Sequence, residues 1–496
     1  MDKVEGMEKA LMWNDIREQI INGDFAKART LIDQKKPRLE AYDDIFAYLE
    51  ASVCEVEQDR EGMFDAIAKG LQYNPQNYEL YYIMGRFYYD AHPDQAFLCL
   101  QNALFYCYVP EDIEMIHAEI KSLMMLHEVT VRNVAIIVPS YNSCYLIQKN
   151  IESIRRTLLE GTYSIIVVDN ASDDGTRQWL EEQKDIILVP NKVNRGFPCA
   201  CNQGVAAISG AGDCDSDIFL LNNDTRLALN SLFWLRMGLY KDQRIGAVGS
   251  CSNYAGNEQQ IDVTFTLPGE YLEYGAKINI PQKYPYEERV RLSGFAMLIR
   301  RDIWNDVGGM DEAFTPGYFE DDDLCMRILQ RGSRLLVCKN SFIYHAGSQS
   351  FSKENNVNNI LLGHHQLFIK KYGFDILEYA VPNRGLPHQI PYTEKQEFSV
   401  LQVGCGIGAD LKYLRLYYPR AHIVGVEFRP ALRRIAGWTE VVFENAEQLA
   451  GSFRLPVFDI VVIDRRIAGT LSENDKEILA GLCREGCKII AAEAER

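Results

Sequence analysis

The chain has 496 residues, of which 47% are hydrophobic and 24% are charged, and its formal net charge is −17 at pH 7. A chain of this length exceeds what one hydrophobic core usually serves, so we expect several domains. The acidic balance argues against general nucleic-acid binding, which needs clustered Lys and Arg, and no apolar run has the roughly 18 to 20 residues of a bilayer span.

The start of the chain and its cysteines both bear on the compartment. The opening segment, MDKVEGMEKALMWNDIREQI, is acidic and amphipathic and lacks the basic and apolar regions of a signal peptide. The 13 cysteines are odd in number and mostly lie in apolar segments, which favours buried thiols over a disulfide framework. Two close pairs lack a partner pair at zinc-site spacing, namely Cys199 with Cys201 and Cys483 with Cys487. We therefore predict a cytoplasmic protein.

Residues 1–130 are predicted to be helical throughout, because Pro and Gly are sparse and apolar residues recur at steps of three and four. A period near 34 residues resembles the tetratricopeptide pattern, with Tyr81, Met84, Gly85, Tyr88, Ala96, Leu100, Ala103 and Pro110 in phase. Arrays of this kind bind peptides or pair subunits. The alternative is a plain helical bundle in which the period arose by chance.

Residues 131–375 alternate predicted strands and helices. A strand at 134–138 is followed by a helix at about 145–159, a strand at 165–168 and a helix that starts near 173–176. This order predicts a parallel sheet with right-handed crossovers, in which ligands bind beyond the carboxyl ends of the strands. Polar segments lie at such ends, namely Pro139 to Asn142, Asp169-Asn170 and Asn222 to Thr225.

Three positions in this region suit a bound nucleotide and metal. Asp169 ends a buried strand, where its carboxylate can accept hydrogen bonds from a pyrimidine N–H or a ribose hydroxyl, although a helix cap is the plainer role. Asp224 ends the apolar strand 218–221 and can ligate a metal, although such a tip is also a common turn. Gly294, in a predicted strand at 293–299, lets a ligand approach the backbone.

The acidic run Glu320-Asp321-Asp322-Asp323 is predicted to open a helix, whose dipole offsets part of the mutual repulsion of the carboxylates. A carboxylate here can act as a general base, whereas the plainer interpretation is a solvated acidic cap. His345 follows strands predicted at 335–337 and 342–344 and is placed to ligate a metal, although a lone His is more often structural.

Seven ordered segments together resemble the family 2 glycosyltransferases of the GT-A fold, particularly their bacterial rhamnosyltransferase-like branch. They are VAIIVPSYNS, IIVVDNASDDGT, NRGFPCACNQG, IFLLNNDT, SGFAMLIRRDIWNDVGGMDEAF, GYFEDDDLCMRILQRG and IYHAGSQS. The resemblance implies an α/β, Rossmann-like mixed sheet and an inverting hexosyl- or N-acetylhexosaminyltransferase of class EC 2.4. It further implies a UDP- or dTDP-sugar donor and Mg²⁺ or Mn²⁺.

The resemblance also implies residue roles. Asp321 would be the catalytic base, and Glu320 and Asp322 are the neighbours that could be confused with it. Asn222 stands where the usual Asp-x-Asp metal motif begins, so Asp224 would be the main carboxylate ligand, helped by His345. The residues implied to bind the nucleotide sugar are Pro139, Tyr141, Asp169, Asn194, Arg195, Gly196, Asn222, Asn223 and Gly294.

Residues 376–397 contain three prolines and are predicted to be a linker. Residues 398–496 repeat the strand–helix pattern, and the glycine-rich turn Gly404 to Gly408, with Glu427 at the end of the next strand, resembles motif I of class I methyltransferases. Asn445 lies near the usual adenine-contacting acid, and Asp464 ends the fourth strand. The pattern stops after the fifth strand, so either the chain is cut short or the Rossmann domain is degenerate, and the expected role is docking or dimerisation. S-adenosylmethionine is therefore not the expected cofactor.

Helical repeats, a family 2 domain and a methyltransferase-like domain in one chain resemble bacterial enzymes that glycosylate flagellin or bacteriocin peptides. This resemblance implies a polypeptide acceptor, modified on Ser, Thr or Cys, and makes the helical and C-terminal domains candidates for a homodimer contact. Three alternatives remain: a surface-polysaccharide or lipid-linked acceptor, a non-catalytic nucleotide-binding scaffold, and a bifunctional glycosyl- and methyltransferase.

Overall fold

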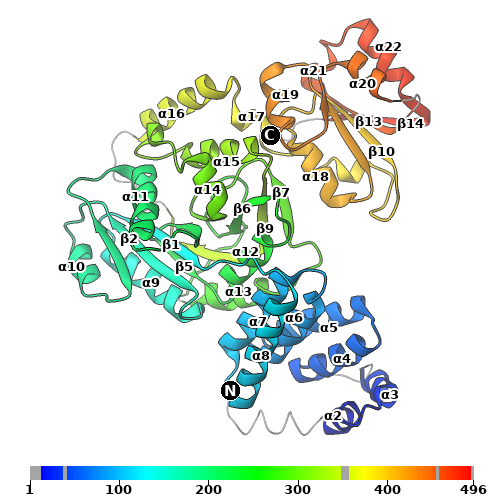
Figure 1. The fold of residues 1–496 in the computed structure, drawn as a ribbon. Helices are drawn as coiled ribbons and strands as arrows, with labels where there is room; N and C mark the ends of the chain where they lie inside the picture. Colours follow the sequence, from blue (N-terminus) through cyan, green and yellow to red (C-terminus); the bar gives the residue numbers. More distant parts are fainter. Residues whose placement is uncertain (1–12, 37–41, 268, 348–356, 454–456, 493–496) are drawn as a thin grey trace.

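The computed structural model describes residues 13–36, 42–267, 269–347, 357–453 and 457–492. A group of N-terminal helices, a central mixed sheet flanked by helices, and a C-terminal parallel sheet follow one another along the chain (Figure 1). Within the described ranges, no helix is both long enough and apolar enough to cross a membrane.

The N-terminal region is helical, as the sequence predicts. α4 begins at Asp44 and α6 at Tyr78, so the expected spacing of about 34 residues is present. A Cβ atom added to Gly70 would lie 2.6 Å from both Ala47 and Leu80, so this position allows neighbouring helices to approach closely. The helices are α2 (Asn14–Ile21), α3 (Phe25–Lys35), α4 (Asp44–Val56), α5 (Arg60–Tyr73), α6 (Tyr78–Tyr88), α7 (Pro93–Tyr106) and α8 (Pro110–Leu126).

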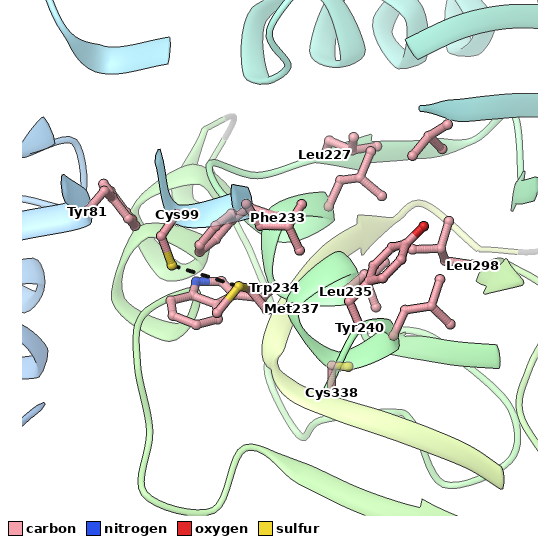
Figure 2. Close-up of a cluster of buried hydrophobic side chains, with 14 of the residues drawn as sticks. Tyr81, Cys99, Leu227, Phe233, Trp234, Leu235, Met237, Tyr240, Leu298 and Cys338 are labelled. Carbon is pink, nitrogen blue, oxygen red and sulfur yellow. Dashed lines mark hydrogen bonds between the residues drawn. The ribbon is translucent and has the colours of Figure 1, made fainter. Parts of the chain in front are cut away.

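These helices pack against the central region through α12 (Ser231–Leu239), all of whose residues are buried. The ring of Tyr81 meets Phe233 edge to face at 5.4 Å between centroids, and Cys99 Sγ lies 3.9 Å from Met237 Sδ (Figure 2). Gln95 donates to the carbonyl of Met237 at 3.0 Å. Because one hydrophobic cluster includes residues of both regions, the helical region is part of the same packed body.

The central sheet is mixed, with strand order β3-β2-β1-β4-β8-β6-β9-β5, and β7 pairs with β9. β1 to β4 are parallel to one another, as the strand–helix alternation predicts, whereas β8 runs antiparallel to both of its neighbours. This arrangement agrees with the GT-A sheet that the resemblance implied. The strands are β1 (Val134–Ser140), β2 (Tyr163–Asp169), β3 (Ile186–Pro190), β4 (Asp217–Leu221), β5 (Thr225–Leu227), β6 (Ile245–Cys251), β7 (Tyr286–Arg289), β8 (Ala296–Ile299) and β9 (Arg334–His345).

Two predicted boundaries are wrong. β8 begins at Ala296, so residues 293–295 precede the strand, and the two strands expected before His345 are the single strand β9. The motif that ends in Ser348, Gln349 and Ser350 extends beyond the described residues. The helices of this region are α9 (Cys144–Thr157), α10 (Thr176–Glu181), α11 (Gly196–Gly210), α12, α13 (Glu270–Ile278), α14 (Arg301–Val307), α15 (Glu320–Gln330) and α16 (Val357–Tyr372).

The C-terminal region is a five-stranded parallel sheet in the order β12-β11-β10-β13-β14, and its five predicted strands are confirmed. The segment before it is packed rather than extended, because Ile376 and Leu386 are fully buried. The elements are α17 (Ile376–Tyr379), β10 (Ser399–Val403), α18 (Ala409–Tyr417), β11 (His422–Val426), α19 (Pro430–Ala436), β12 (Val442–Phe443), α20 (Ala446–Ser452), β13 (Phe458–Asp464), α21 (Arg465–Ala468), α22 (Glu473–Gly481) and β14 (Cys483–Ala492).

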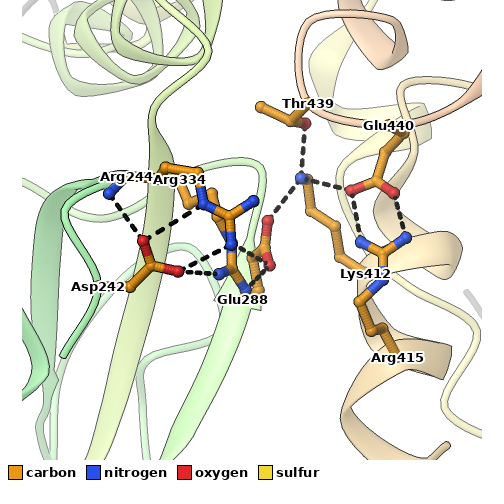
Figure 3. Close-up of polar contacts among 8 residues, drawn as sticks. All are labelled: Asp242, Arg244, Glu288, Arg334, Lys412, Arg415, Thr439 and Glu440. Atoms are coloured by element: carbon orange, nitrogen blue, oxygen red, sulfur yellow. Dashed lines mark hydrogen bonds and ion pairs between the residues drawn. The ribbon is translucent and has the colours of Figure 1, made fainter. Parts of the chain in front are cut away.

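A buried ion network joins this region to the central sheet (Figure 3). Lys412 Nζ lies 2.8 Å from a carboxylate oxygen of Glu288 on β7 and 2.9 Å from one of Glu440. Burial alone would raise the pKa of Glu288, but the charges of Lys412 and Arg334 outweigh it and hold that pKa at about 2. The Glu288 carboxylate therefore remains ionised at neutral pH, where it pairs with Lys412.

Candidate active site

A cavity of about 550 Å³ lies at the carboxyl ends of β1 and β4, a volume typical of small-molecule sites. Nearly all of the predicted site residues line it, although they come from distant parts of the sequence. They are Pro139, Tyr141, Asn194, Gly196, Asn222, Asn223, Asp224, Gly294, Glu320, Asp321, Asp322 and His345. Asp169 and Arg195 are the two predicted residues that do not line the cavity.

The tip between β4 and β5 (residues 222–225), which includes Asp224, is hydrogen-bonded to α9. The buried amide of Asn150 donates to the carbonyls of Asn222 and Thr225 at 3.2 and 3.1 Å. The hydroxyl of Thr225 donates to the carbonyl of Asn222 at 2.7 Å, and Asn223 donates to Ser140 at 3.2 Å. Because the backbone of the tip is bonded on several sides, Asp224 has a defined position at the edge of the cavity.

Asp224 and His345 meet although 121 positions separate them in the sequence, as His345 Nε2 lies 3.0 Å from Asp224 Oδ1. The other ring nitrogen, Nδ1, lies 2.7 Å from the carbonyl oxygen of Tyr254, which can only accept, so Nδ1 carries the proton. Nε2 is then the ring nitrogen that faces the Asp224 carboxylate, so the imidazole and the carboxylate are placed to bind one cation together.

This pair fits a hard divalent cation. Adjacent ligands of an octahedral ion, each about 2.1 Å from it, lie about 3.0 Å apart, and Mg²⁺ in particular usually takes one or two carboxylates and completes its shell with water and substrate phosphates. A ligand His that donates its other N–H to a backbone carbonyl is also the usual arrangement around bound metals. Among the residues that the structure describes, no group of three or more His, Cys, Asp or Glu side chains could hold a metal ion. Phosphate and water oxygens would therefore have to complete the shell.

The acidic run forms the first turn of α15, as predicted, and Asp321 faces the cavity. Gly294 N–H donates to Asp321 Oδ2 at 3.1 Å, and Asp322 N–H donates to Oδ1 at 2.9 Å. The two residues before the run, Tyr318 and Phe319, have φ values of 71° and 68°, in the left-handed region that non-glycine residues rarely adopt. This backbone turn directs the start of α15 into the cavity.

The three cavity carboxylates hold protons more tightly than exposed acids do. Burial, followed by the charge of Asp321, raises the pKa of Glu320 well above its ordinary value. The same two causes raise the pKa of Asp322 to about 7, against the charge of Arg291. Burial raises the pKa of Asp321 as well, while the N–H groups of Gly294 and Asp322 oppose the shift. The cluster is therefore only partly ionised near neutral pH, as an acid–base site requires.

Asp323, the fourth acid of the run, has a structural role. It is fully buried and lies 2.8 Å from Arg327 Nε and 2.5 Å from Lys371 Nζ, and it accepts a hydrogen bond from the hydroxyl of Tyr372. These bonds connect the first turn of α15 to α16. The run thus divides into three residues that face the cavity and one that anchors the helix.

Asp169 is placed differently from the expected nucleotide contact. Its side chain is fully buried, and it accepts from Arg177 Nε at 2.7 Å and from the N–H of Ser172 at 3.2 Å. The neighbouring Asn170 lines the cavity instead, and its amide oxygen accepts from Asn191 at 2.9 Å. A direct bond between Asp169 and a nucleotide therefore stays a prediction that would require Arg177 to move.

Sequence reasoning missed several residues of the cavity wall. Arg291, whose side chain is 13% exposed, lies 3.6 Å from Asp322, and Asn257 lies 3.5 Å from the same carboxylate oxygen. Arg291 is the cationic side chain among the lining residues of the described chain. It precedes the Ser-Gly-Phe segment, so a search for a cation near the acidic run could have selected it, whereas nothing in the sequence distinguishes Asn257.

Part of the chain is similar to known glycosyltransferases. Residues 135–306 match the model described as Glycosyl transferase family 2, a span that includes the Asp224 tip and Gly294 but ends before α15 and His345. The chain is 24% identical over 237 residues to the uncharacterized protein y4gI of Sinorhizobium fredii, which covers 45% of this chain and 25% of that protein. The chain therefore spans about a quarter of the length of this relative.

Two further matches were found. The chain is 25% identical over 216 residues to the N-acetylglucosaminyl-diphospho-decaprenol L-rhamnosyltransferase of Mycobacterium tuberculosis, which covers 39% of this chain and 70% of that protein. A crystal structure of GalNAc-T7 with UDP, GalNAc and Mn²⁺ aligns at a TM-score of 0.39 with 14% identity, over 52% of each chain.

Proposed function

We propose that this chain, which contains a family 2 glycosyltransferase domain at residues 135–306, is an inverting enzyme that moves a sugar from a UDP- or dTDP-sugar to a polypeptide. The proposal rests on one observation: Asp321 lines the same cavity as the Asp224–His345 pair. Sugar transfer needs these two features together, because one proton must leave the acceptor while a diphosphate departs from the sugar.

In this mechanism Asp321 is the base. The acceptor oxygen or sulfur attacks the anomeric carbon, the bond from that carbon to the diphosphate oxygen breaks, and Asp321 takes the acceptor proton. Burial raises the pKa of Asp321, which strengthens it as a proton acceptor once it is ionised. The N–H of Gly294 orients its Oδ2 atom. Glu320 and Asp322 share the same turn and are the alternative bases.

Asp224 and His345 would hold Mg²⁺ or Mn²⁺, which would supply positive charge to the departing diphosphate. Asn222 Nδ2 lies 3.4 Å from His345 Nε2, so an amide stands beside the proposed ligands where the usual motif has a carboxylate. A site with one carboxylate binds a divalent cation more weakly than a site with two. Pro139, Tyr141, Asn194 and Gly196 would contact the nucleotide from the other wall of the cavity.

The polypeptide acceptor rests on the N-terminal helices, whose spacing of about 34 residues suits a tetratricopeptide-like array that binds peptides. A lipid-linked or surface-glycan acceptor is the second candidate. It is favoured by the similarity to the mycobacterial enzyme, whose name specifies a decaprenol-linked acceptor. The two candidates differ in whether transfer leaves the sugar on protein or in a lipid-soluble product.

The test is a donor screen with the full chain. A panel of UDP- and dTDP-sugars with Mn²⁺ or Mg²⁺ is expected to contain a donor that raises the melting temperature, because ligands that bind the folded state stabilise it. Sugar hydrolysis or transfer, followed by mass spectrometry, then identifies the reaction. If no donor is bound or turned over, the proposal is contradicted. Donor binding without any turnover would favour the non-catalytic nucleotide-binding scaffold.

Asp321→Asn tests the base. Asparagine cannot accept the proton, so transfer is expected to fall by about 10²- to 10⁴-fold while donor binding is retained. Asp323→Asn is unsuitable as a control because it breaks ion pairs, whereas Asp215→Asn changes an exposed acid far from the cavity and should leave the rate unchanged. Full transfer by Asp321→Asn would contradict the assignment and point to Glu320 or Asp322.

A further inference from the structure

The glycine-rich turn of the C-terminal sheet has no role in the proposed reaction, yet it is occupied by another part of the chain. Tyr379, the last residue of α17, lies directly against this turn, since a Cβ atom added to Gly406 would be 3.2 Å from its ring. Gly406 has a φ of 58°, so a larger residue would be both strained and obstructed there. A close approach to this glycine is therefore made by a tyrosine of the same polypeptide.

The two carboxylates beside the turn are also occupied. Glu427, at the end of β11, accepts from the N–H of Gly406 at 2.8 Å and from Arg429 at 2.7 and 2.9 Å. Asp464, at the end of β13, pairs with Arg466. These carboxylates thus hold two arginines instead of the hydroxyl groups of a ligand.

Both arginines then hold α17. The guanidinium of Arg429 lies 5.0 Å and that of Arg466 lies 4.5 Å from the centre of the Tyr379 ring, within the range of cation–π attraction. Arg429 also donates to the Tyr379 hydroxyl at 2.8 Å, and Arg466 donates to the carbonyl of Glu378 at 2.9 Å. α17 has only four residues and could not persist alone, so these contacts contribute to its order together with the buried side chain of Ile376.

The other end of α17 reaches the transferase cavity. Leu377 lines that cavity although its side chain is half exposed, which places an apolar group at the opening. The N–H of Leu377 donates to Asp375, which pairs with His365 at 2.8 Å, and the ring of His365 stacks on Phe319 at 5.1 Å. Phe319 directly precedes the acidic run. Leu377 therefore lies on the side of the cavity that contains the carboxylates, where the acceptor must approach.

We propose that the glycine-rich turn of the C-terminal domain binds the chain's own segment α17. This contact fixes Leu377 as part of the acceptor-side wall of the transferase cavity. One hydrophobic cluster includes Ile376 and Ala380 of this segment, Ile407 of the turn and residues of the central sheet, which makes the coupling rigid. In this role the C-terminal domain shapes acceptor specificity and takes no S-adenosylmethionine. The acceptor part of the inference rests on the proposed function, whereas the binding of α17 does not.

Hydrogen exchange on the full chain tests the binding of α17 without any substrate. Tyr379→Ala is expected to raise the exchange rates of the amides at 377–380 at least about tenfold while those of β10 and β13 stay slow. Arg484→Met is the matched control, because Arg484 pairs with Asp459 in the same sheet without touching α17. If Tyr379→Ala does not fold, Tyr379→Phe removes only the bond from Arg429 and should give a smaller increase.

Unchanged exchange of α17 in Tyr379→Ala would overturn the proposal. So would S-adenosylmethionine that raises the melting temperature of the wild-type chain while α17 stays protected. Once a donor and an acceptor are known, Leu377→Ser is expected to raise the KM for the acceptor several-fold more than the KM for the donor. An equal rise in both KM values would contradict the specificity role. If no donor is ever turned over, the proposed function fails but the exchange result still decides whether the glycine-rich turn holds α17.

Discussion

Adjacent carboxylates at the start of α15 share a limited supply of compensating charge. Arg291 is 3.6 Å from Asp322, and its charge opposes without cancelling the rise that burial and Asp321 cause in the Asp322 pKa. Asp321 instead receives two backbone N–H groups. The difference in surroundings, rather than in residue type, separates Asp321, the proposed base, which the backbone orients, from its neighbour Asp322, which titrates near neutral pH.

The pH dependence of stability should report on Asp322. Because its pKa is raised from 3.8 to about 7, the folded state holds a proton that the unfolded chain releases between these values, and stability falls as pH rises through that window. The Asp322→Asn side chain cannot ionise, so the melting temperature of this variant, relative to that of the wild type, should increase between about pH 4 and about pH 7. Thermal unfolding at several pH values measures this. Parallel curves, as expected for Asp215→Asn, would show that Asp322 is not the titrating group.

The Asp224–His345 pair makes a second prediction at this scale. His345→Gln removes the imidazole that faces Asp224 at 3.0 Å, and metal-dependent UDP binding is expected to weaken at least about tenfold because one of the two proposed protein ligands is lost. Isothermal titration with Mn²⁺ and UDP measures the effect, with His422→Gln, an exposed residue of the C-terminal sheet, as control. Equal affinities for wild type and His345→Gln would exclude His345 as a ligand.

At the scale of elements, α9 supports the tip that joins β4 and β5. Asn150 is fully buried, and the two N–H groups of its amide lie within hydrogen-bond distance of three oxygens, the carbonyls of Asn222 and Thr225 and the hydroxyl of Thr225. Asn150→Ala removes these bonds, although the Asn222 carbonyl keeps the bond from the Thr225 hydroxyl, so we expect a loss of about 1 to 3 kcal/mol in the free energy of unfolding and weaker metal binding at the proposed Asp224 site. Urea denaturation measures the first effect. Gln148→Ala, on the same helix and only partly buried, should change neither quantity. Unchanged stability of Asn150→Ala would mean that the sheet alone holds the tip.

At the scale of the whole molecule, the ion network of Figure 3 joins the C-terminal and central regions. Lys412 is 1% exposed and compensates Glu288 and Glu440 together. Lys412→Met would leave both carboxylates buried without their shared cation, which we expect to cost about 3 to 5 kcal/mol and to separate the C-terminal sheet as an earlier melting step. Calorimetry would detect the two steps. Lys476→Met, which breaks an exposed pair, should melt like the wild type, and a single unshifted transition for Lys412→Met would show that the apolar contacts alone hold the regions together.

Much of the secondary structure followed from local pattern. The strand–helix alternation predicted β1, β2, β4 and the five C-terminal strands, because burial on both faces of a parallel strand leaves a continuous apolar run. The boundary errors at β8 and β9 arose where strands meet irregular segments. There the hydrogen-bond partners come from distant residues, and no local pattern indicates where pairing begins.

The sequence by itself determined which residue types stand at the strand ends and at the start of α15, and with the family resemblance it predicted 12 of the residues that line the cavity, including Asp224, Asp321 and His345. Only the tertiary structure decided how these groups are used. It turned Asp323 away from the cavity into an ion pair, buried Asp169 against Arg177, and brought Arg291 beside the acids. It also placed Tyr379 against the glycine-rich turn at Gly406. The physical reason is that the amino-acid sequence fixes the type of each residue, whereas the ionisation of a side chain and its access to the cavity depend on neighbours that only folding brings together.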